Sequence, residues 1–144
     1  MRAVDSNILI YADREEVPQH STALKVLSGL ATGAESWAIP WPCIYEYLRV
    51  VTHPRVFHPP TPVLEAWESV EALLASPSIV PLAEGQRHRE ILNDLLRNVT
   101  ITGNLLHDAH IAALLIEHGV DEILTADEDF RRFARLRVTN PFHP

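Results

Sequence analysis

Carboxylates are the side chains of this 144-residue chain best placed to do chemistry. The densest group lies near the C-terminus, where the apolar pair Ile123-Leu124 leads to Asp127 and Asp129. Acids gathered at the end of a buried strand repel one another, and each costs free energy to desolvate without a partner. A fold tolerates such a group when a cation or protons neutralise it, or when solvent reaches it. A metal-ion or proton-transfer site is therefore the first chemistry to consider.

Three further acids occupy positions from which they can reach the same point. Asp5 ends an apolar N-terminal segment, Glu46 lies one turn into a helix-like segment, and Asp108 opens another. Open parallel sheets place their sites beyond the carboxyl ends of the strands, and right-handed winding brings separate segments to that edge. We therefore expect these acids to converge with Asp127, and with Asp129 two residues beyond it.

Two chemistries fit such a cluster. Hard cations such as Mg²⁺ or Mn²⁺ prefer oxygen ligands and need only a few carboxylates. Two such ions ~4 Å apart can activate a water and stabilise the leaving oxygen of a phosphodiester. Without metal, the same acids would have raised pKa values and would share protons, as in acid proteases or glycosidases. Spacing alone leaves both open, and each acid could also simply cap a helix or strand or lie on a solvated helix face.

Strand-like and helix-like segments alternate through most of the chain. Apolar runs bounded by turn residues predict strands at 2–5, 37–40, 79–82, 123–124 and 136–138. Apolar residues at helical spacing predict helices at 8–13, 18–33, 42–52, 61–74, 84–97, 105–119 and 127–133, with Ser6-Asn7 capping the first and Thr61 the fourth. This alternation predicts a three-layer α/β/α sandwich with a mostly parallel central sheet, as a single domain over residues 1–144.

Composition narrows the classes of partner. A formal net charge of −7 argues against gripping nucleic acid through bulk positive potential, although bound divalent metal would offset part of the excess. The single cysteine, Cys43, excludes internal disulfides and indicates a reducing cytoplasm. No apolar run reaches the ~18 residues of a membrane span, and no secretory leader is evident. We therefore expect a cytoplasmic protein that does not engage membranes.

Other side chains with reactive or stacking potential favour structural roles. His107 adjoins Asp108 and could touch a phosphate, but a cap or surface position suits it better. His110, two residues past Asp108, should point away from it on a helix. Cys43 and Trp41 are expected in the core or at an interface. No His-x-x-x-His or Cys/His spacing typical of a zinc site occurs.

The acidic motifs, taken in order, resemble those of PIN-domain nucleases. The resemblance rests on Val4-Asp5-Ser6-Asn7-Ile8-Leu9, Glu46, His107-Asp108-Ala109-His110-Ile111-Ala112-Ala113 and Leu124-Thr125-Ala126-Asp127-Glu128-Asp129-Phe130. It covers residues 2–141. Length and layout make the chain most similar to VapC-type toxins of bacterial toxin–antitoxin pairs.

This resemblance implies an Mg²⁺- or Mn²⁺-dependent endoribonuclease. Four acids would hold the metals and orient the attacking water, with Asp129 as an auxiliary acid: Asp5, Glu46, Asp108 and Asp127. Ser6 and Thr125 would position them through hydrogen bonds. The family also implies a homodimer and a VapB-type antitoxin whose C-terminal tail blocks the acidic site.

Two features beside the resemblance complete the expectations. Arg131, Arg132 and Arg135 follow the last acidic motif, and we predict that they contact phosphate. A metal-dependent phosphatase is an alternative, because such enzymes carry a nucleophilic Asp at an early strand end. They usually have a second Asp two residues later, where this chain has Asn7. A non-catalytic PIN-like domain that binds RNA or a protein partner is the other alternative.

Overall fold

The computed structural model describes residues 1–143, which contain one five-stranded parallel sheet. Its strands are β1 (Arg2–Val4), β2 (Trp37–Pro40), β3 (Ile79–Leu82), β4 (Glu122–Leu124) and β5 (Arg137–Thr139). They are arranged in the order β3-β2-β1-β4-β5, and every neighbouring pair is parallel. The chain therefore winds outward from β1 on one side and returns to build the other side. The predicted parallel sheet is confirmed.

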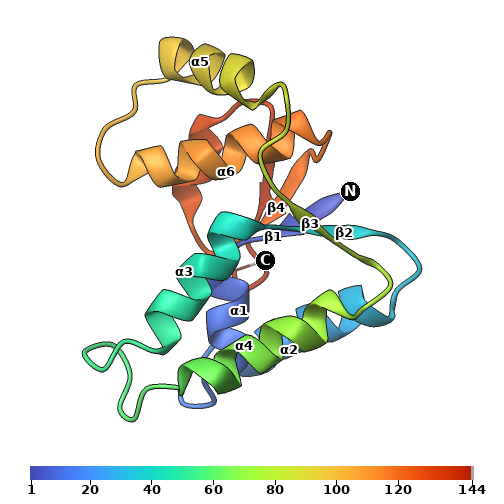
Figure 1. Cartoon of the computed structure of the whole chain (residues 1–144), viewed down its shortest axis with the longest axis vertical. Coiled ribbons are helices and arrows are strands. Elements are labelled where there is room, and N and C mark those ends of the chain that lie inside the picture. Colours follow the sequence, from blue (N-terminus) through green and yellow to red (C-terminus); the bar gives the residue numbers. More distant parts are fainter. Residues whose placement is uncertain (144) are drawn as a thin grey trace.

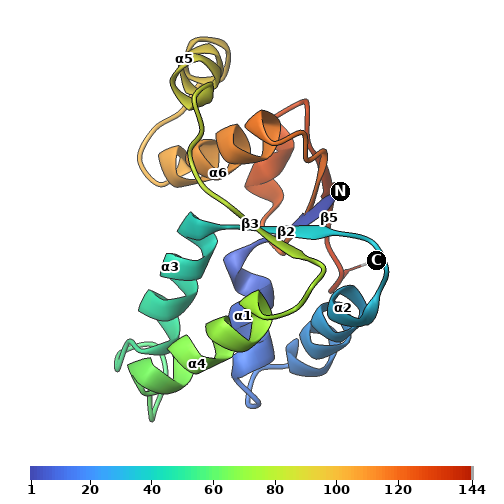
Figure 2. The same ribbon diagram turned by 45° about the vertical axis from the view of Figure 1, so that its right-hand side comes forward.

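Helices cover both faces of this sheet. They are α1 (Ser6–Asp13), α2 (His20–Thr32), α3 (Trp41–Val51), α4 (Val63–Leu74), α5 (His88–Asn98), α6 (Leu105–Glu117) and the 3₁₀ helix η1 (Glu128–Arg132). Figures 1 and 2 show α6 on one side of the strands, with α5 outside it, and α1 to α4 on the other. The three-layer α/β/α arrangement expected from the sequence is therefore present.

The hydrophobic core fills the space between the sheet and its two helical layers. Trp37, Phe130 and Phe133 are among its largest fully buried side chains. The indole Nε1 of Trp37 donates a hydrogen bond to Ser78 Oγ at 3.1 Å, so its one polar group is satisfied. Within α6, the run 111–115 is buried on every side, because α6 lies between the sheet and α5.

Several predicted helix boundaries were wrong, each for a local reason. The first helix is capped by Asp5, whose carboxylate accepts the Ser6 N–H, and it begins two residues before the predicted start. Thr61 does not cap α4: its hydroxyl donates instead to Asp13 Oδ2 at 2.7 Å, and Pro62 occupies the cap position. The second helix begins at His20, after a turn that contains Pro18.

The helix predicted from residue 84 begins only at His88. The carboxylate of Glu117 accepts hydrogen bonds from the backbone N–H groups of Gly85 and Arg87, at 3.0 Å each, and so holds residues 84–87 as a loop. Among the described residues, no helix combines the length and apolarity needed to traverse a bilayer.

Candidate active site

The register of the central strands brings the first and last acidic motifs together. Val4 of β1 pairs with Leu124 of β4, and the N–H of Asp5 donates to the Leu124 carbonyl at 3.1 Å. Asp5 and Thr125 therefore follow adjacent strands at the same edge. Because the chain reverses its winding direction between β1 and β4, this edge is the topological switch point, where open α/β folds bind ligands.

Asp5 is buried and held by a full set of hydrogen bonds. Its Oδ1 accepts the N–H of Ser6 at 2.7 Å, and its Oδ2 accepts the Thr125 hydroxyl at 2.6 Å and Asn7 Nδ2 at 3.1 Å. The thiol of Cys43 lies 3.6 Å from Oδ1. Burial raises the pKa of Asp5, while the hydrogen bonds from Thr125 and Ser6 act in the opposite direction. With both oxygens engaged, this carboxylate is fixed in orientation and is a poor candidate for the phosphatase nucleophile.

Asn7 joins the end of β4 to the start of α1, a role that we did not predict from the sequence. Its Nδ2 donates to Thr125 Oγ1 at 3.0 Å, and its Oδ1 accepts the N–H of Ala126 at 3.1 Å. Thr125 Oγ1 also accepts the N–H of Asp127 at 2.9 Å. The hydroxyl of Thr125 thus links Asp5 to the backbone that carries Asp127. Only the position of Asn7 two residues after a strand-end acid hinted at this role.

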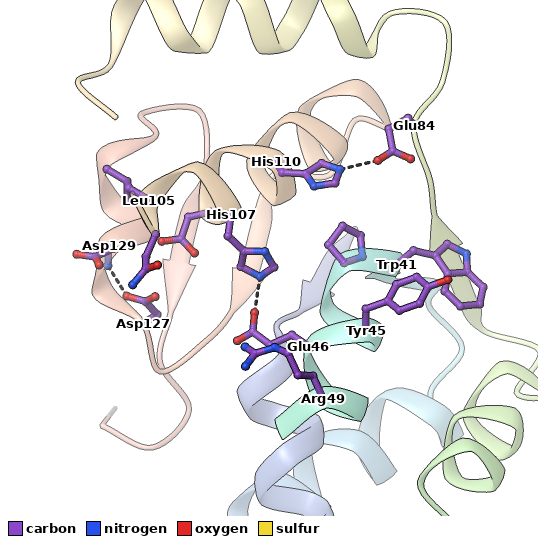
Figure 3. Close-up of a pocket in the computed structure, with 13 residues that line it drawn as sticks. Trp41, Tyr45, Glu46, Arg49, Glu84, Leu105, His107, His110, Asp127 and Asp129 are labelled. Atoms are coloured by element: carbon purple, nitrogen blue, oxygen red, sulfur yellow. Dashed lines mark hydrogen bonds and ion pairs between the residues drawn. The ribbon is translucent and has the colours of Figure 1, made fainter. Parts of the chain in front are cut away.

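Three aspartates form the compact part of the acidic cluster. Asp108 in α6, Asp127 after β4 and Asp129 in η1 each offer a carboxylate oxygen, and these three atoms lie within 4.8 Å of one another. Asp127 Oδ1 accepts the N–H of Asp129 at 2.8 Å, which caps η1. The side chains of Asp127 and Asp129 lie next to each other in Figure 3.

Asp108 bears a large electrostatic penalty. It is 9% exposed, and burial together with the charges of Asp127 and Asp5 raises its pKa to about 7. A carboxylate in this position is half-protonated near neutral pH unless a cation offsets the repulsion. The predicted convergence of Asp108, Asp127 and Asp129 therefore creates a strong demand for positive charge.

Glu46 reaches the cluster from α3, where it contacts two residues that come from other elements. Its Oε1 accepts the Ser6 hydroxyl at 3.0 Å, and its Oε2 is paired with Nε2 of His107 in α6 (Figure 3). The bond from His107 lowers the pKa of Glu46, and the same bond raises the pKa of His107. His107 therefore belongs to the site. Its side chain is 40% exposed, as a surface position predicts, but its contact with Glu46 was not predicted from the sequence.

Four of the five predicted acids open onto a cleft of about 870 Å³, and the buried Asp5 does not line it. It is lined by Trp41, Pro42, Tyr45, Glu46, Arg49, Glu84, Asn104, Leu105, His107, Asp108, His110, Asp127 and Asp129. Figure 3 shows the aspartates at one end, the Trp41 and Tyr45 rings at the other, and Glu46 with Arg49 between them. Trp41 was expected in the core or at an interface, and Tyr45 was not singled out from the sequence. Both side chains face the cleft.

The arginines predicted to contact phosphate lie outside this lining. Arg131, Arg132 and Arg135 are exposed, and Arg131 is paired with Glu128. Among the described residues, the guanidinium that lines the cleft belongs to Arg49. Any contact by the three predicted arginines would therefore involve a ligand that extends past the cleft.

The chemistry of the donor set fits a hard divalent cation. Asp108, Asp127 and Asp129 present oxygen atoms only, and their charges repel one another. Asp108 and Asp127 are partly shielded from water, whereas Asp129 is exposed. Mg²⁺ and Mn²⁺ favour such carboxylate sites and retain water ligands. Glu46 and Asp5 flank the trio and are already tied to protein donors.

Comparison with known proteins agrees with this geometry. The family model of the PIN domain matches residues 2–136. Ribonuclease VapC43 of Mycobacterium tuberculosis is 39% identical over 141 residues, which span 98% of this chain and 95% of that protein. Ribonuclease VapC37 of the same species is 36% identical over 141 residues, covering 98% of this chain and 97% of that protein.

Solved structures share the fold at lower sequence identity. The sarcin-ricin loop cleaving toxin VapC20 of Mycobacterium tuberculosis has a TM-score of 0.66 at 14% identity, covering 91% of this chain and 93% of that one. A chain in the crystal structure of VapBC2 from Rickettsia felis, bound to a DNA fragment from their promoter, has a TM-score of 0.64 at 19% identity, covering 96% of this chain and 97% of that one.

Proposed function

This chain belongs to the PIN-domain family, and on that premise we propose that it is a metal-dependent endoribonuclease toxin, restrained by a VapB-type antitoxin. The observation that carries the proposal is the meeting of Asp108, Asp127 and Asp129 with Glu46 and Asp5 at one sheet edge. Relatives that are 36–39% identical over nearly the whole chain are named ribonucleases, which supports RNA as the substrate. Such a substrate would place the protein in the cytoplasm.

Each acidic residue has a distinct part in this proposal. Asp108, Asp127 and Asp129 would hold Mg²⁺ or Mn²⁺, with Glu46 and Asp5 completing the polar surround. The bound cation would supply Lewis-acid stabilisation of the phosphodiester and lower the pKa of a water. Asp5 is oriented through its hydrogen bonds to Thr125, Ser6 and Asn7, so it is suited to fix the shape of the site.

Ser6 and Thr125 act as positioning residues. The Ser6 hydroxyl lies between Asp5 and Glu46, at 3.4 Å and 3.0 Å from their oxygens, and therefore sets the distance between an acid that follows β1 and an acid of α3. Thr125 does the same for Asp5 and the backbone of Asp127. Such outer hydrogen bonds keep carboxylates aligned before the cation and substrate arrive.

The aromatic end of the cleft supports single-stranded RNA as the form that binds. Trp41 and Tyr45 lie with their ring centroids 6.2 Å apart, and the Tyr45 side chain is 68% exposed. Unpaired bases stack readily on exposed aromatic rings, whereas bases inside a duplex present no free face. Arg49, on the same helix, is placed to meet a phosphate of that strand.

An antitoxin tail with a basic side chain would compete for the same acids. The demand for positive charge around Asp108 is met equally by a cation and by a guanidinium, so the tail and the metal would exclude each other. We also retain a homodimer as part of the proposal. Sedimentation of the free chain and of the toxin–antitoxin complex would measure both assemblies.

The direct test is RNA cleavage by the purified chain with and without added Mg²⁺ or Mn²⁺. Wild type should cleave single-stranded RNA only with metal, and the Asp108→Asn and Asp5→Asn proteins should lose at least about 100-fold in rate. Glu71→Gln removes an exposed acid of α4 and serves as the matched control, with unchanged rate. Equal cleavage by all four proteins would point to a contaminating nuclease and overturn the proposal.

A further inference from the structure

A second group of metal-ligating side chains lies at the far rim of the cleft, away from the three aspartates. Glu84 follows β3, His88 opens α5, and His110 lies in the middle of α6. Each offers one ligand atom, and the three atoms lie within 4.8 Å of one another. We propose that Glu84, His88 and His110 form a transition-metal site, selective for Zn²⁺ over Mg²⁺, that clamps the start of α5 to α6.

The donor types separate this site from the acidic one. Two imidazoles and one carboxylate suit Zn²⁺ and similar borderline ions, with a fourth position open to water. Mg²⁺ demands oxygen ligands and binds imidazole poorly. The aspartate end of the cleft would therefore bind Mg²⁺, and the end with the two histidines would bind Zn²⁺.

An ordinary ion pair accounts for only part of the arrangement. His110 Nε2 lies 2.5 Å from Glu84 Oε1, which by itself is a common surface contact (Figure 3). It leaves His88 unexplained: its ring lies 5.4 Å from that of His110, and its side chain is only 17% exposed. The Nδ1 atom of His88 is buried and has no hydrogen-bond partner among the described residues. A buried imidazole nitrogen without a partner costs free energy, and a metal ion in the group would relieve that cost.

The loop that carries Glu84 is held in place before any ion arrives. The Glu117 carboxylate accepts the N–H groups of Gly85 and Arg87, and the imidazole of His118 lies 2.8 Å from the Ala83 carbonyl. A Cβ atom at Gly85 would lie 2.5 Å from Glu117 Oε2, so a larger residue there would displace the carboxylate that accepts these two hydrogen bonds. The ligand atoms are thus preorganised, which lowers the ordering cost of binding.

Glu117 adds a negative charge beside the proposed metal ligands. Its Oε1 lies 3.9 Å from His88 Nδ1, too far for a direct hydrogen bond but near enough to offset part of the charge of a bound cation. Because α5 lies outside α6 and away from the sheet (Figures 1 and 2), it packs on the rest of the fold mainly through α6. Metal binding would therefore stabilise α5 and would add positive charge to the rim of an otherwise acidic cleft.

The test uses the full chain without a histidine tag, stripped of metal and titrated with Zn²⁺ by calorimetry in a millimolar excess of Mg²⁺ that occupies the aspartates. Wild type should bind one Zn²⁺, and His88→Gln should weaken that binding by at least about 100-fold, beyond the 10–100-fold that loss of an outer partner causes. Asp127→Asn should bind Zn²⁺ as wild type does. His58→Gln, which replaces an exposed histidine of the α3–α4 loop, is the matched control and should also bind normally.

Two further readouts keep the result independent of ribonuclease activity and of folding defects. Zn²⁺ at about a hundredfold excess over its Kd should raise the Tm of wild type by roughly 5–10 °C but leave that of His88→Gln unchanged. X-ray absorption at the zinc edge should show imidazole ligands. Unaltered Zn²⁺ binding by His88→Gln, or loss of binding only in Asp127→Asn, would overturn this site without touching the proposed nuclease function.

Discussion

The raised pKa of Asp108 allows the electrostatics of the cleft to be tested by experiment. Its pKa is raised from 3.8 to about 7, first by burial and then by Asp127 and Asp5. Because the folded chain binds this proton more tightly than the unfolded chain, the contribution of Asp108 to stability is greatest at low pH. Between about pH 4 and pH 7 that contribution is lost as pH rises. A bound metal ion would stabilise the ionised form of Asp108 and so offset this loss of stability.

The Asp108→Asn protein should therefore be more stable than wild type when both are free of metal at pH 8, and the difference should shrink at pH 5. Removing an unfavourable buried charge of ~1 kcal/mol raises the Tm of a chain this size by roughly 2–4 °C. Scanning calorimetry in chelator at the two pH values measures the effect. A difference of the same size at both pH values would mean that the substitution acts through packing.

Added Mg²⁺ should stabilise wild type and have little effect on Asp108→Asn. The affinity of wild type for Mg²⁺ should also rise as pH increases through about 7, because Asp108 must lose its proton to bind the ion.

Thr125 offers a second test at the scale of one residue. Its hydroxyl, which is fully buried, connects Asp5, Asn7 and the backbone N–H of Asp127. Thr125→Val keeps the shape and removes these bonds, so the cleavage rate should fall about 10–100-fold. The pKa of Asp5 should rise further, which would move the acid limb of the pH–rate profile to higher pH. Thr125→Ser should retain most of the rate and the original profile, and identical behaviour of the two variants would contradict the positioning role.

At the scale of elements, the sequence predicted strand ends better than helix starts. Short apolar runs ending in Asp5 and Leu124 mark buried parallel strands, and parallel topology then dictates that residues after them share an edge. The late start of α5 depends instead on Glu117, a residue 32 positions from Gly85 that captures its N–H. A contact of that kind has no local signature. The same is true of the pairing of Glu46 with His107, which depends on how α3 and α6 face each other.

Helix α3 places three cleft residues on one face, because Trp41, Tyr45 and Arg49 recur every four positions. If unpaired bases stack there, Tyr45→Ala should weaken the binding of single-stranded RNA by ~1–3 kcal/mol, or roughly 5–150-fold. Anisotropy of a labelled oligonucleotide in an Asp108→Asn background, which leaves the RNA intact, measures this affinity. Tyr45→Phe should bind as the parent does.

If Tyr45 serves to stack RNA bases, it should contribute little to the stability of the folded protein. Since the Tyr45 side chain is 68% exposed, its removal should leave the Tm within about 1 °C of the parent. An equal loss of affinity in the alanine and phenylalanine variants would instead assign the effect to the Tyr45 hydroxyl.

For the whole molecule, the question is how a chain of net charge −7 holds a polyanion. The cleft contributes Arg49, the Glu46-paired His107 and any bound metal, against a row of acids. Nonspecific attraction should therefore be weak, and recognition should depend on the metal and on stacking. Arg131 and Arg132 belong to η1, whose Asp129 lines the cleft, so RNA running past Asp129 would meet them next. The pairing of Arg131 with Glu128 is exposed and therefore weak enough to be exchanged for a phosphate.

RNA length should then control the salt dependence of binding at constant Mg²⁺. Each phosphate contact to a single strand contributes about −0.7 to the slope of log K against log salt. An RNA short enough to fill only the cleft should give a slope of about −0.7 to −1.4. Arg49→Gln should make that slope less negative by about 0.7. A longer RNA should give a slope steeper by about 2, and replacing Arg131, Arg132 and Arg135 by Gln should return it to the value of the short RNA. If wild type gives the same shallow slope at both lengths, these three arginines do not contact phosphate, and the cleft alone holds the substrate.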